Sequence, residues 1–174
     1  IDEFDLPYEA RNPHTPIVHQ GKVWFTDANN NTYGRLDPAT GKVDVWTVAA
    51  PKSVPYGMYA APDGSVWIAH LGTNQLGRVN PVTGVLTAYP LPDSGARPRR
   101  LAVTSDGTVW YTDYARGYLG ALDPATGKVR EWPTPGGNAG PYGISVGTDG
   151  RIWYNEARTG DMIAFNPKTQ QMTV

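Results

Sequence analysis

The chain has 174 residues, of which 40% are hydrophobic and 11% aromatic, and 15 Lys and Arg stand against 16 Asp and Glu for a formal net charge of −1. Six Trp and ten Tyr argue against a disordered chain, while 20 Gly and 16 Pro indicate many turns. The near-neutral charge without a basic block argues against nucleic acid as a partner, no apolar stretch is long enough for a transmembrane segment, and the absence of Cys excludes disulfides and thiolate metal sites.

The sequence repeats with a period of 43 residues. Four Trp residues keep this spacing, and a second block, Gly-Arg-Leu-Asp-Pro-Ala-Thr-Gly at 34–41, returns at 77–84, at 120–127 and more loosely at 163–170. A fixed period of this length is typical of repeat folds such as propellers. The repeats run over about 13–54, 55–97, 98–140 and 141–174, and the four Trp residues are Trp24, Trp67, Trp110 and Trp153.

Each repeat predicts four short antiparallel strands. In the second repeat a strand over 56–60 follows a Pro, an Asp-Gly turn leads into the Trp strand at 65–70, and a third strand ends near the Pro turn at 80–84. The fourth strand covers 86–89, and its equivalents are 43–46 and 129–132. Four such strands per repeat indicate an all-β fold, a β-propeller with four blades in a single domain over 1–174. We interpret the Trp residues as packing between blades, with ligand stacking as the alternative.

The two ends of the chain both resemble the outermost strand of a blade. Ile1–Phe4 match Val129–Trp132, and residues 171–174 begin the same strand of the last repeat. We therefore expect the N-terminal strand, residues 1–6, to complete the last blade and protect its edge. Three assemblies remain open: a closed four-bladed ring, four blades of a larger ring, and a homodimer in which two chains complete a ring of eight.

The blade motifs resemble those of the streptogramin (virginiamycin) B lyase-like propellers. The similarity covers essentially the whole chain and rests on motifs such as Pro-Tyr-Gly-Ile at 141–144, Leu-Gly-Ala-Leu-Asp-Pro-Ala-Thr-Gly at 119–127 and Glu-Trp-Pro-Thr-Pro at 131–135. It implies a seven-bladed ring in the lyase itself, with Mg²⁺-assisted opening of a cyclic depsipeptide at its ester C–O bond. It also implies an active site on the central face, with His after the opening Pro of two blades and Glu just before one such Pro.

The chain keeps only part of that catalytic pattern. The position after the opening Pro is occupied by His14, Tyr56, Arg99 and Tyr142, and none of these Pro residues follows a Glu. A base and a metal-assisting group must surround one substrate, so His14, the single catalytic candidate, does not carry the lyase mechanism alone. Further blades, if the protein has them, are where the missing residues would lie.

Two sets of candidate site residues fall on one face of the predicted propeller. Three Arg residues of the first set replace apolar or small residues of the other blades, and they can clamp a carboxylate or phosphate, pair with a partner protein, or remain solvated. This set, the candidate ligand-binding residues, comprises Tyr56, Arg97, Arg99, Arg100 and Tyr142.

The second set ends the Trp strands and comprises Asp27, His70, Asp113 and Glu156. Carboxylates and an imidazole near a central channel can bind a divalent cation, Mg or Ca. Because the set recurs once per blade, as turn residues do, the favoured interpretation is that the acids accept backbone N–H bonds in the loops. Both interpretations remain open.

Intact blade motifs beside an incomplete catalytic pattern favour a binding or scaffolding module. We expect its central face to take a protein partner or a small-molecule ligand, and we expect an exported protein, periplasmic or extracellular. The alternative is an enzyme, a Mg-dependent carbon–oxygen lyase of the streptogramin B type.

Overall fold

A computed structural model describes residues 3–174 as four antiparallel sheets of four strands each. In every sheet the strands are neighbours in chain order, as expected for the blades of a propeller. Among the described residues no helix is long and apolar enough to cross a bilayer. In chain order the strands are β1 (Pro13–His19), β2 (Lys22–Asp27), β3 (Thr32–Leu36), β4 (Val43–Thr47), β5 (Pro55–Ala60), β6 (Val66–His70), β7 (Gln75–Val79), β8 (Leu86–Pro90), β9 (Pro98–Val103), β10 (Val109–Asp113), β11 (Tyr118–Leu122), β12 (Val129–Pro133), β13 (Pro141–Val146), β14 (Ile152–Glu156), β15 (Met162–Asn166) and β16 (Gln171–Thr173).

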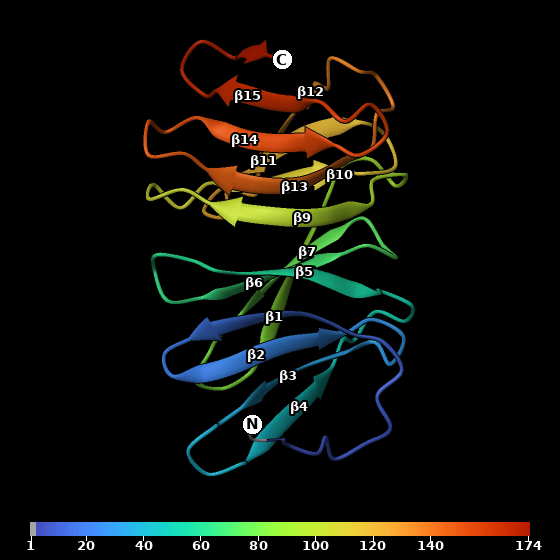
Figure 1. Ribbon diagram of the computed structural model, residues 1–174, viewed down its shortest axis with the longest axis vertical. Coiled ribbons are helices and arrows are strands. Elements are labelled where there is room, and N and C mark those ends of the chain that lie inside the picture. Colours follow the sequence, from blue (N-terminus) through green and yellow to red (C-terminus); the bar gives the residue numbers. More distant parts are fainter. Residues whose placement is uncertain (1–2) are drawn as a thin grey trace.

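The four blades form an open arc. The inner strand β1 packs beside β5, β5 beside β9, and β9 beside β13. The sheets therefore follow one another from the N-terminal blade to the C-terminal blade, which lie at opposite ends of the molecule (Figure 1). The predicted propeller of four-stranded blades is confirmed, and residues 3–174 form an arc rather than the closed four-bladed ring that was one of the alternatives.

The N-terminal segment lies beside the first blade. Residues 3–6 form no strand. The Phe4 ring lies next to Gly41 of the first blade, so close that a Cβ added to Gly41 would be 3.7 Å from it. In the last sheet β16 is an edge strand, paired only with β15 among the described residues. The expected pairing of residues 1–6 with the last blade is therefore not found for residues 3–6, because the arc keeps the two ends apart; residues 1–2 lie outside the described part of the chain.

The core consists of three interfaces between blades. In each, the Trp face of one sheet packs against the aliphatic face of the next, as in the contact of Trp24 with the face of Met58 and Ile68. Trp67 and Trp110 do the same one and two blades further on. These three Trp residues are at most 3% exposed, which confirms their role in packing between blades. Trp153 is only partly buried, because no further described blade covers its face.

The two ends of each blade differ in character. At one end, Asp-Gly turns connect the first and second strands, with Gly64 and Gly107 at φ +86°, a conformation that disfavours any Cβ. At the other end the inner strands begin at their Pro residues, where the candidate site residues gather.

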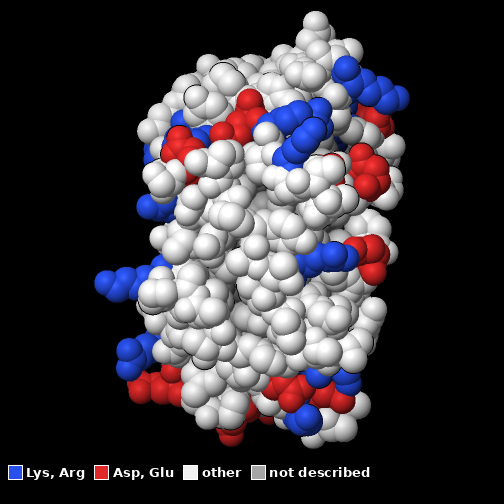
Figure 2. Space-filling model, turned by 180° about the vertical axis from the view of Figure 1, so that it is seen from behind, with Lys and Arg blue, Asp and Glu red and all other residues white. Residues whose placement is uncertain are grey.

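Basic and acidic side chains are interspersed on the face seen in Figure 2, in keeping with the net charge of −1.

Candidate functional site

The same local structure opens every blade. The Pro that begins each inner strand pairs with the last residue of the Trp strand: Pro13 with Asp27, Pro55 with His70, Pro98 with Asp113 and Pro141 with Glu156. The register shifts just after the Pro in the second, third and fourth blades, and between His14 and Ile17 in the first. A bulge of this kind re-aims the side chains beside it. The residues after the four Pro residues are thereby brought to one end of the arc.

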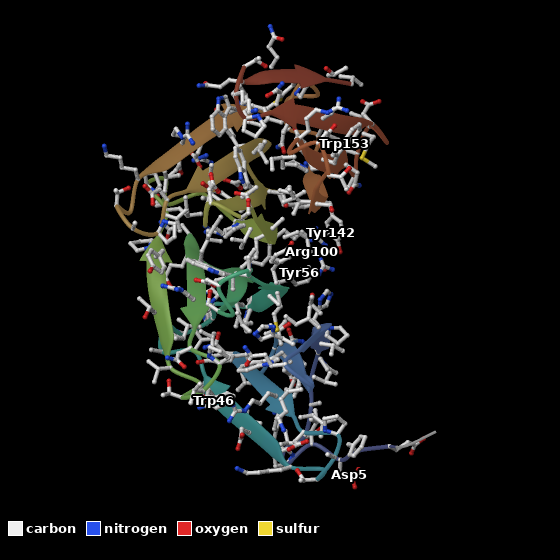
Figure 3. The ribbon with its side chains drawn as sticks, turned by 90° about the vertical axis from the view of Figure 1, so that its left-hand side faces the viewer. Asp5, Trp46, Tyr56, Arg100, Tyr142 and Trp153 are labelled. Carbon is white, nitrogen blue, oxygen red and sulfur yellow. The ribbon has the colours of Figure 1, made fainter. Side chains whose placement is uncertain are left out.

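These side chains converge on the inner face of the arc. We call His14, Tyr56, Arg99, Arg100 and Tyr142 the inner-face cluster. The hydroxyls of Tyr56 and Tyr142, which come from the second and fourth blades, are 3.3 Å apart. Figure 3 shows Tyr56, Arg100 and Tyr142 side by side at the inner edge of the blades. All five residues are half-buried, so the cluster is open to a ligand.

Both guanidinium groups of the cluster lie over aromatic rings. The Cζ atom of Arg99 is 4.2 Å, 4.3 Å and 5.1 Å from the ring centres of Tyr114, Tyr142 and Tyr56. The Cζ atom of Arg100 is 5.2 Å and 5.4 Å from those of Tyr56 and Tyr142. Cation–π attraction therefore holds the two positive groups in place without an acid.

Hydrogen bonds order the same groups. Arg99 Nη2 donates to the Tyr56 hydroxyl at 3.2 Å, and Arg100 Nη1 donates to Thr15 Oγ1 at 2.6 Å. Thr15 Oγ1 lies 2.9 Å from Nδ1 of His14. The Thr15 hydroxyl has one donor and two acceptor positions, so it can accept from Arg100 and share a second hydrogen bond with Nδ1 of His14.

The electrostatic environment of the cluster is positive. Burial, followed by the positive charges of Arg100 and Arg99, lowers the pKa of His14, so its imidazole is neutral at pH 7. The hydrogen bond with Tyr56 and the nearby Arg100 and Arg99 lower the pKa of Tyr142, although burial opposes the shift. The cluster thus has two fixed positive charges and favours negative charge in its neighbourhood.

A hollow adjoins the cluster on the side of the first blade. It is lined by the apolar side chains of Pro13, Pro16 and Phe25 together with His14, Thr15 and Arg100. The guanidinium, the imidazole and the Thr15 hydroxyl make part of its lining polar, and the Pro and Phe side chains make the rest apolar. The hollow therefore suits a ligand with one polar and one apolar part.

Arg97 does not join the cluster. Its Nη1 donates to the carbonyl oxygens of Ser94 at 2.9 Å and Ala96 at 2.6 Å, so the guanidinium folds back over its own loop.

Tyr114 does join the cluster, although the sequence analysis did not select it. The repeat contains a signal for it, because Tyr114 stands where the other blades have Ala28, Leu71 and Ala157.

The residues that end the Trp strands lie behind this surface, fully buried. Asp27 accepts the backbone N–H groups of Arg11 and Asn12 at 3.2 Å and 3.0 Å. Asp113 accepts the N–H of Arg97 at 3.0 Å, and Glu156 accepts the N–H of Gly136 at 3.3 Å. Each carboxylate therefore fixes the loop that leads into the inner strand of its own blade.

His70 takes the place of a carboxylate in the second blade. It is fully buried, and neither ring nitrogen has a hydrogen-bond partner among the described residues. Burial lowers the pKa of His70 to about 4, so the ring is neutral at pH 7. Within residues 3–174 no three His, Asp or Glu side chains lie close enough together to hold a metal ion, so the four metal-site candidates are not brought into one site and do not fit the Mg²⁺ that the resemblance implies.

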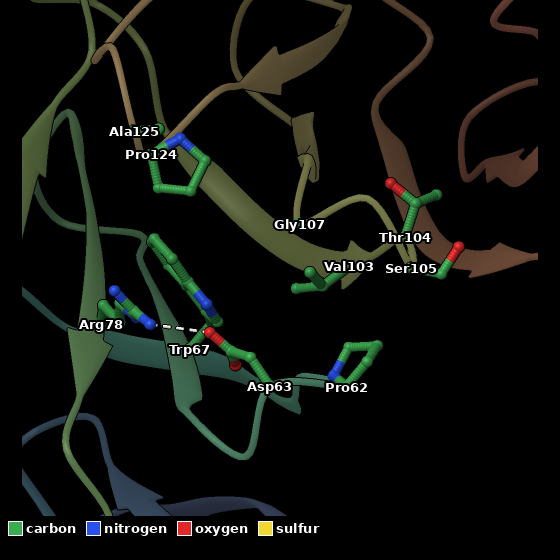
Figure 4. Close-up of a pocket in the computed structure, with 10 residues that line it drawn as sticks. All are labelled: Pro62, Asp63, Trp67, Arg78, Val103, Thr104, Ser105, Gly107, Pro124 and Ala125. Atoms are coloured by element: carbon green, nitrogen blue, oxygen red, sulfur yellow. Dashed lines mark hydrogen bonds and ion pairs between the residues drawn. The ribbon is translucent and has the colours of Figure 1, made fainter.

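A second hollow lies at the opposite end of the blades, between the second and third sheets (Figure 4). Its wall includes Trp67, Val103 and Pro124, and its charged groups, Arg78 and Asp63, pair with each other at 2.7 Å. Because these two charges pair with each other, this hollow has fewer charged groups free to bind a ligand than the inner-face cluster has.

A family model described as the virginiamycin B lyase family matches residues 1–170. Comparison with curated proteins found no match. Among solved structures, a catalytically inactive virginiamycin B lyase from Staphylococcus aureus with quinupristin is 26% identical, with a TM-score of 0.90, over 99% of this chain and 58% of that one. A streptogramin B lyase is 28% identical, with a TM-score of 0.90, over 99% of this chain and 57% of that one. The chain thus spans less than two thirds of these relatives.

More distant structures share the fold alone. The extracellular domain of a one-component system from B. thetaiotaomicron is 18% identical, with a TM-score of 0.78, over 99% of this chain and 23% of that one.

Proposed function

This chain belongs to the virginiamycin B lyase family, and we propose that it acts as a ligand-binding module of that family. The proposed site is the inner-face cluster, and the ligand is a small molecule or a segment of a protein partner. One observation carries the proposal: Tyr56, Arg99 and Tyr142, from three different blades, meet at one place. The Tyr56 hydroxyl lies 3.3 Å from the Tyr142 hydroxyl and 3.2 Å from Nη2 of Arg99, and the Arg99 guanidinium lies over the Tyr142 ring. Half-buried aromatic faces beside unpaired donors are typical of binding sites.

Ring opening of a depsipeptide has less support in this part of the chain. The cluster holds one imidazole, that of His14, and no carboxylate, whereas the acids Asp27, Asp113 and Glu156 are occupied by backbone N–H groups of their own loops. A general base and a partner group around one substrate are thus not assembled by residues 3–174. We therefore propose binding rather than lyase activity for this chain.

We also propose that the protein works in the periplasm or outside the cell. The support is the fold, which also occurs in an extracellular domain of a B. thetaiotaomicron protein. Fractionation of the source cells with an antibody against this chain tests the location, and recovery in the cytoplasm alone would contradict it.

A fragment screen by NMR tests the proposed site. With backbone amides assigned, fragments that bind are expected to shift resonances at the start of β1, β5, β9 and β13. Tyr56→Ala is expected to abolish these shifts, whereas Pro124→Ala, in the opposite hollow, is expected to leave them unchanged. Fragments that shift only residues of the opposite hollow would refute the assignment.

Lyase activity is tested separately with quinupristin and Mg²⁺, followed by mass spectrometry. We expect no ring-opened product. Ring opening that depends on Mg²⁺ and is lost in His14→Ala would show that the chain is an enzyme.

A further inference from the structure

We infer that the inner-face cluster binds an anionic group, a carboxylate or a phosphate, carried by a small ligand with an apolar or aromatic ring. The inference rests on the proposed function, since it names the chemical class of the ligand at the same site. Arg99 and Arg100 are the recognition groups, and the hollow beside His14 receives the ring.

The first argument is an imbalance of charge. Neither Arg99 nor Arg100 has an Asp or Glu within ion-pair distance in residues 3–174. Three of the four other half-buried Arg residues do have one: Arg35 pairs with Asp44 at 3.0 Å, Arg116 with Glu131 at 2.8 Å and Arg151 with Asp149 at 2.6 Å. The fourth, Arg97, donates to two backbone carbonyl oxygens instead. Half-buried charges are ordinarily paired. Two adjacent positive groups without an acid therefore indicate that the counter-charge comes from a ligand.

The second argument is the number of free donors. A guanidinium carries five N–H donors. Arg99 uses a donor of Nη2 on Tyr56, and its Nε is buried without a partner among the described residues. Arg100 donates to Thr15 and to Tyr142, the latter at 3.4 Å. The remaining Nη donors of the two guanidinium groups can form the paired, parallel hydrogen bonds by which Arg recognises carboxylates and phosphates.

The third argument is the character of every other group that faces the cluster. His14, from β1, is neutral at pH 7, because burial and the two Arg charges lower its pKa, and its Nδ1 lies 2.9 Å from Thr15 Oγ1. Tyr56, Tyr114 and Tyr142, from β5, from the loop after β10 and from β13, contribute hydroxyls and ring faces. Each of these groups has a hydrogen-bond donor or an apolar face, and none of them is a carboxylate, so no negative side chain among them repels an anion.

The ring of the ligand has a defined place. The hollow is lined both by the polar side chains of Arg100 and His14 and by the apolar side chains of Pro13, Pro16 and Phe25. An anionic group on the guanidinium would direct an attached ring toward these apolar side chains. An aromatic carboxylate or an aryl phosphate has this combination of groups.

The test compares four probes by titration calorimetry and NMR: benzoate, phenyl phosphate, inorganic phosphate and the neutral isostere benzamide. We expect benzoate or phenyl phosphate to bind at the cluster roughly tenfold to hundredfold more tightly than benzamide, as expected for hydrogen bonds to charged groups. The ratio of the affinities for benzoate and for phenyl phosphate shows whether the site prefers a carboxylate or a phosphate. Binding of inorganic phosphate as tight as that of phenyl phosphate would overturn the assignment of the ring to the hollow.

Three variants locate the effect. Arg99→Gln and Arg100→Gln should each weaken binding of the preferred anion by about tenfold or more. The matched control is Arg130→Gln, on the exposed outer strand β12, where Arg130 stacks on Trp132 and has no ion pair among the described residues. Unchanged affinity in both cluster variants, or equal loss in the control, would overturn the inference.

The outcomes separate this inference from the proposed function. If benzamide binds at the cluster as tightly as benzoate, the anion inference is wrong and the cluster is still a binding site. If every probe shifts resonances away from the inner-face cluster, the proposed site is wrong as well. The comparison of benzoate with benzamide uses the unmodified protein, so it stays decisive even where an Arg variant folds poorly.

Discussion

Replacement of Asp113 by Ala should destabilise the third blade and loosen the loop that precedes β9, the strand of Arg99. The Asp113 carboxylate is fully buried; its Oδ1 accepts the N–H groups of Arg97 at 3.0 Å and of Arg116 at 3.3 Å, and its Oδ2 accepts Arg116 Nε at 2.9 Å. Each N–H left without a partner costs about 1–3 kcal/mol. Arg116 keeps its ion pairs with Asp93 and Glu131. We therefore expect the free energy of unfolding to fall by about 3 kcal/mol, the lower end of the range of about 3–5 kcal/mol that is typical when one partner of a buried pair is removed.

Urea unfolding followed by Trp fluorescence measures this loss. For an m-value of about 2 kcal/mol/M, the midpoint of Asp113→Ala should fall by roughly 1.5 M. The control is Asp123→Ala in the same blade, where an exposed carboxylate accepts the N–H of Ala125 at 2.9 Å and its loss should cost about 1 kcal/mol at most. Asp113→Ala should also weaken benzoate binding, because Arg97 lies two residues before Arg99. Equal losses of stability in the two variants would refute the loop-holding role of Asp113.

Three further predictions concern titration and packing. Burial holds the pKa of His70 at about 4, against 6.5 in the unfolded chain, so between these pH values the unfolded chain binds more protons than the folded one. The free energy of unfolding should therefore fall by up to about 3 kcal/mol as the pH drops from 6.5 to 4. An NMR titration midpoint of His70 near 6.5 would contradict this. Arg100→Gln should raise the pKa of His14, measured by the same NMR titration, because it removes a nearby positive charge, and an unchanged midpoint would show that Arg100 does not act on the imidazole. Trp110→Ala should lower the free energy of unfolding in urea by about 3–5 kcal/mol and Trp153→Ala by clearly less, because Trp110, unlike Trp153, is enclosed between two blades. Similar losses in the two variants would show that another blade covers Trp153 in solution.

The blade plan could be read from the sequence because it is local and repeated. The strands predicted over 56–60 and 86–89 are Pro55–Ala60 and Leu86–Pro90 in the structure. Trp residues at a fixed period, flanked by Asp-Gly and Pro turns, specify a strand and its buried face together. The packing role of Trp24, Trp67 and Trp110 followed directly from that pattern.

The site was predictable only in part, because it depends on how separate blades approach each other. The repeat identified Arg99 and Arg100 as departures from the other blades, and the structure brings both into the cluster. Arg97 departs from the repeat in the same way, yet its side chain turns to the carbonyl groups of its own loop, a rotamer choice that spacing does not reveal. The open arc was likewise not decided by the sequence, since matching blade faces are equally compatible with a closed ring.

The most direct test of the central claim follows the Arg side chains themselves. In an NMR titration that detects the Nε–Hε groups, benzoate should shift the signals of Arg99 and Arg100 in a saturable way, and benzamide at the same concentration should not. The signals of Arg78 and Arg130, which lie away from the cluster, should stay in place. Shifts at Arg78 or Arg130 with none at Arg99 and Arg100 would contradict an anion site on the inner face of this propeller.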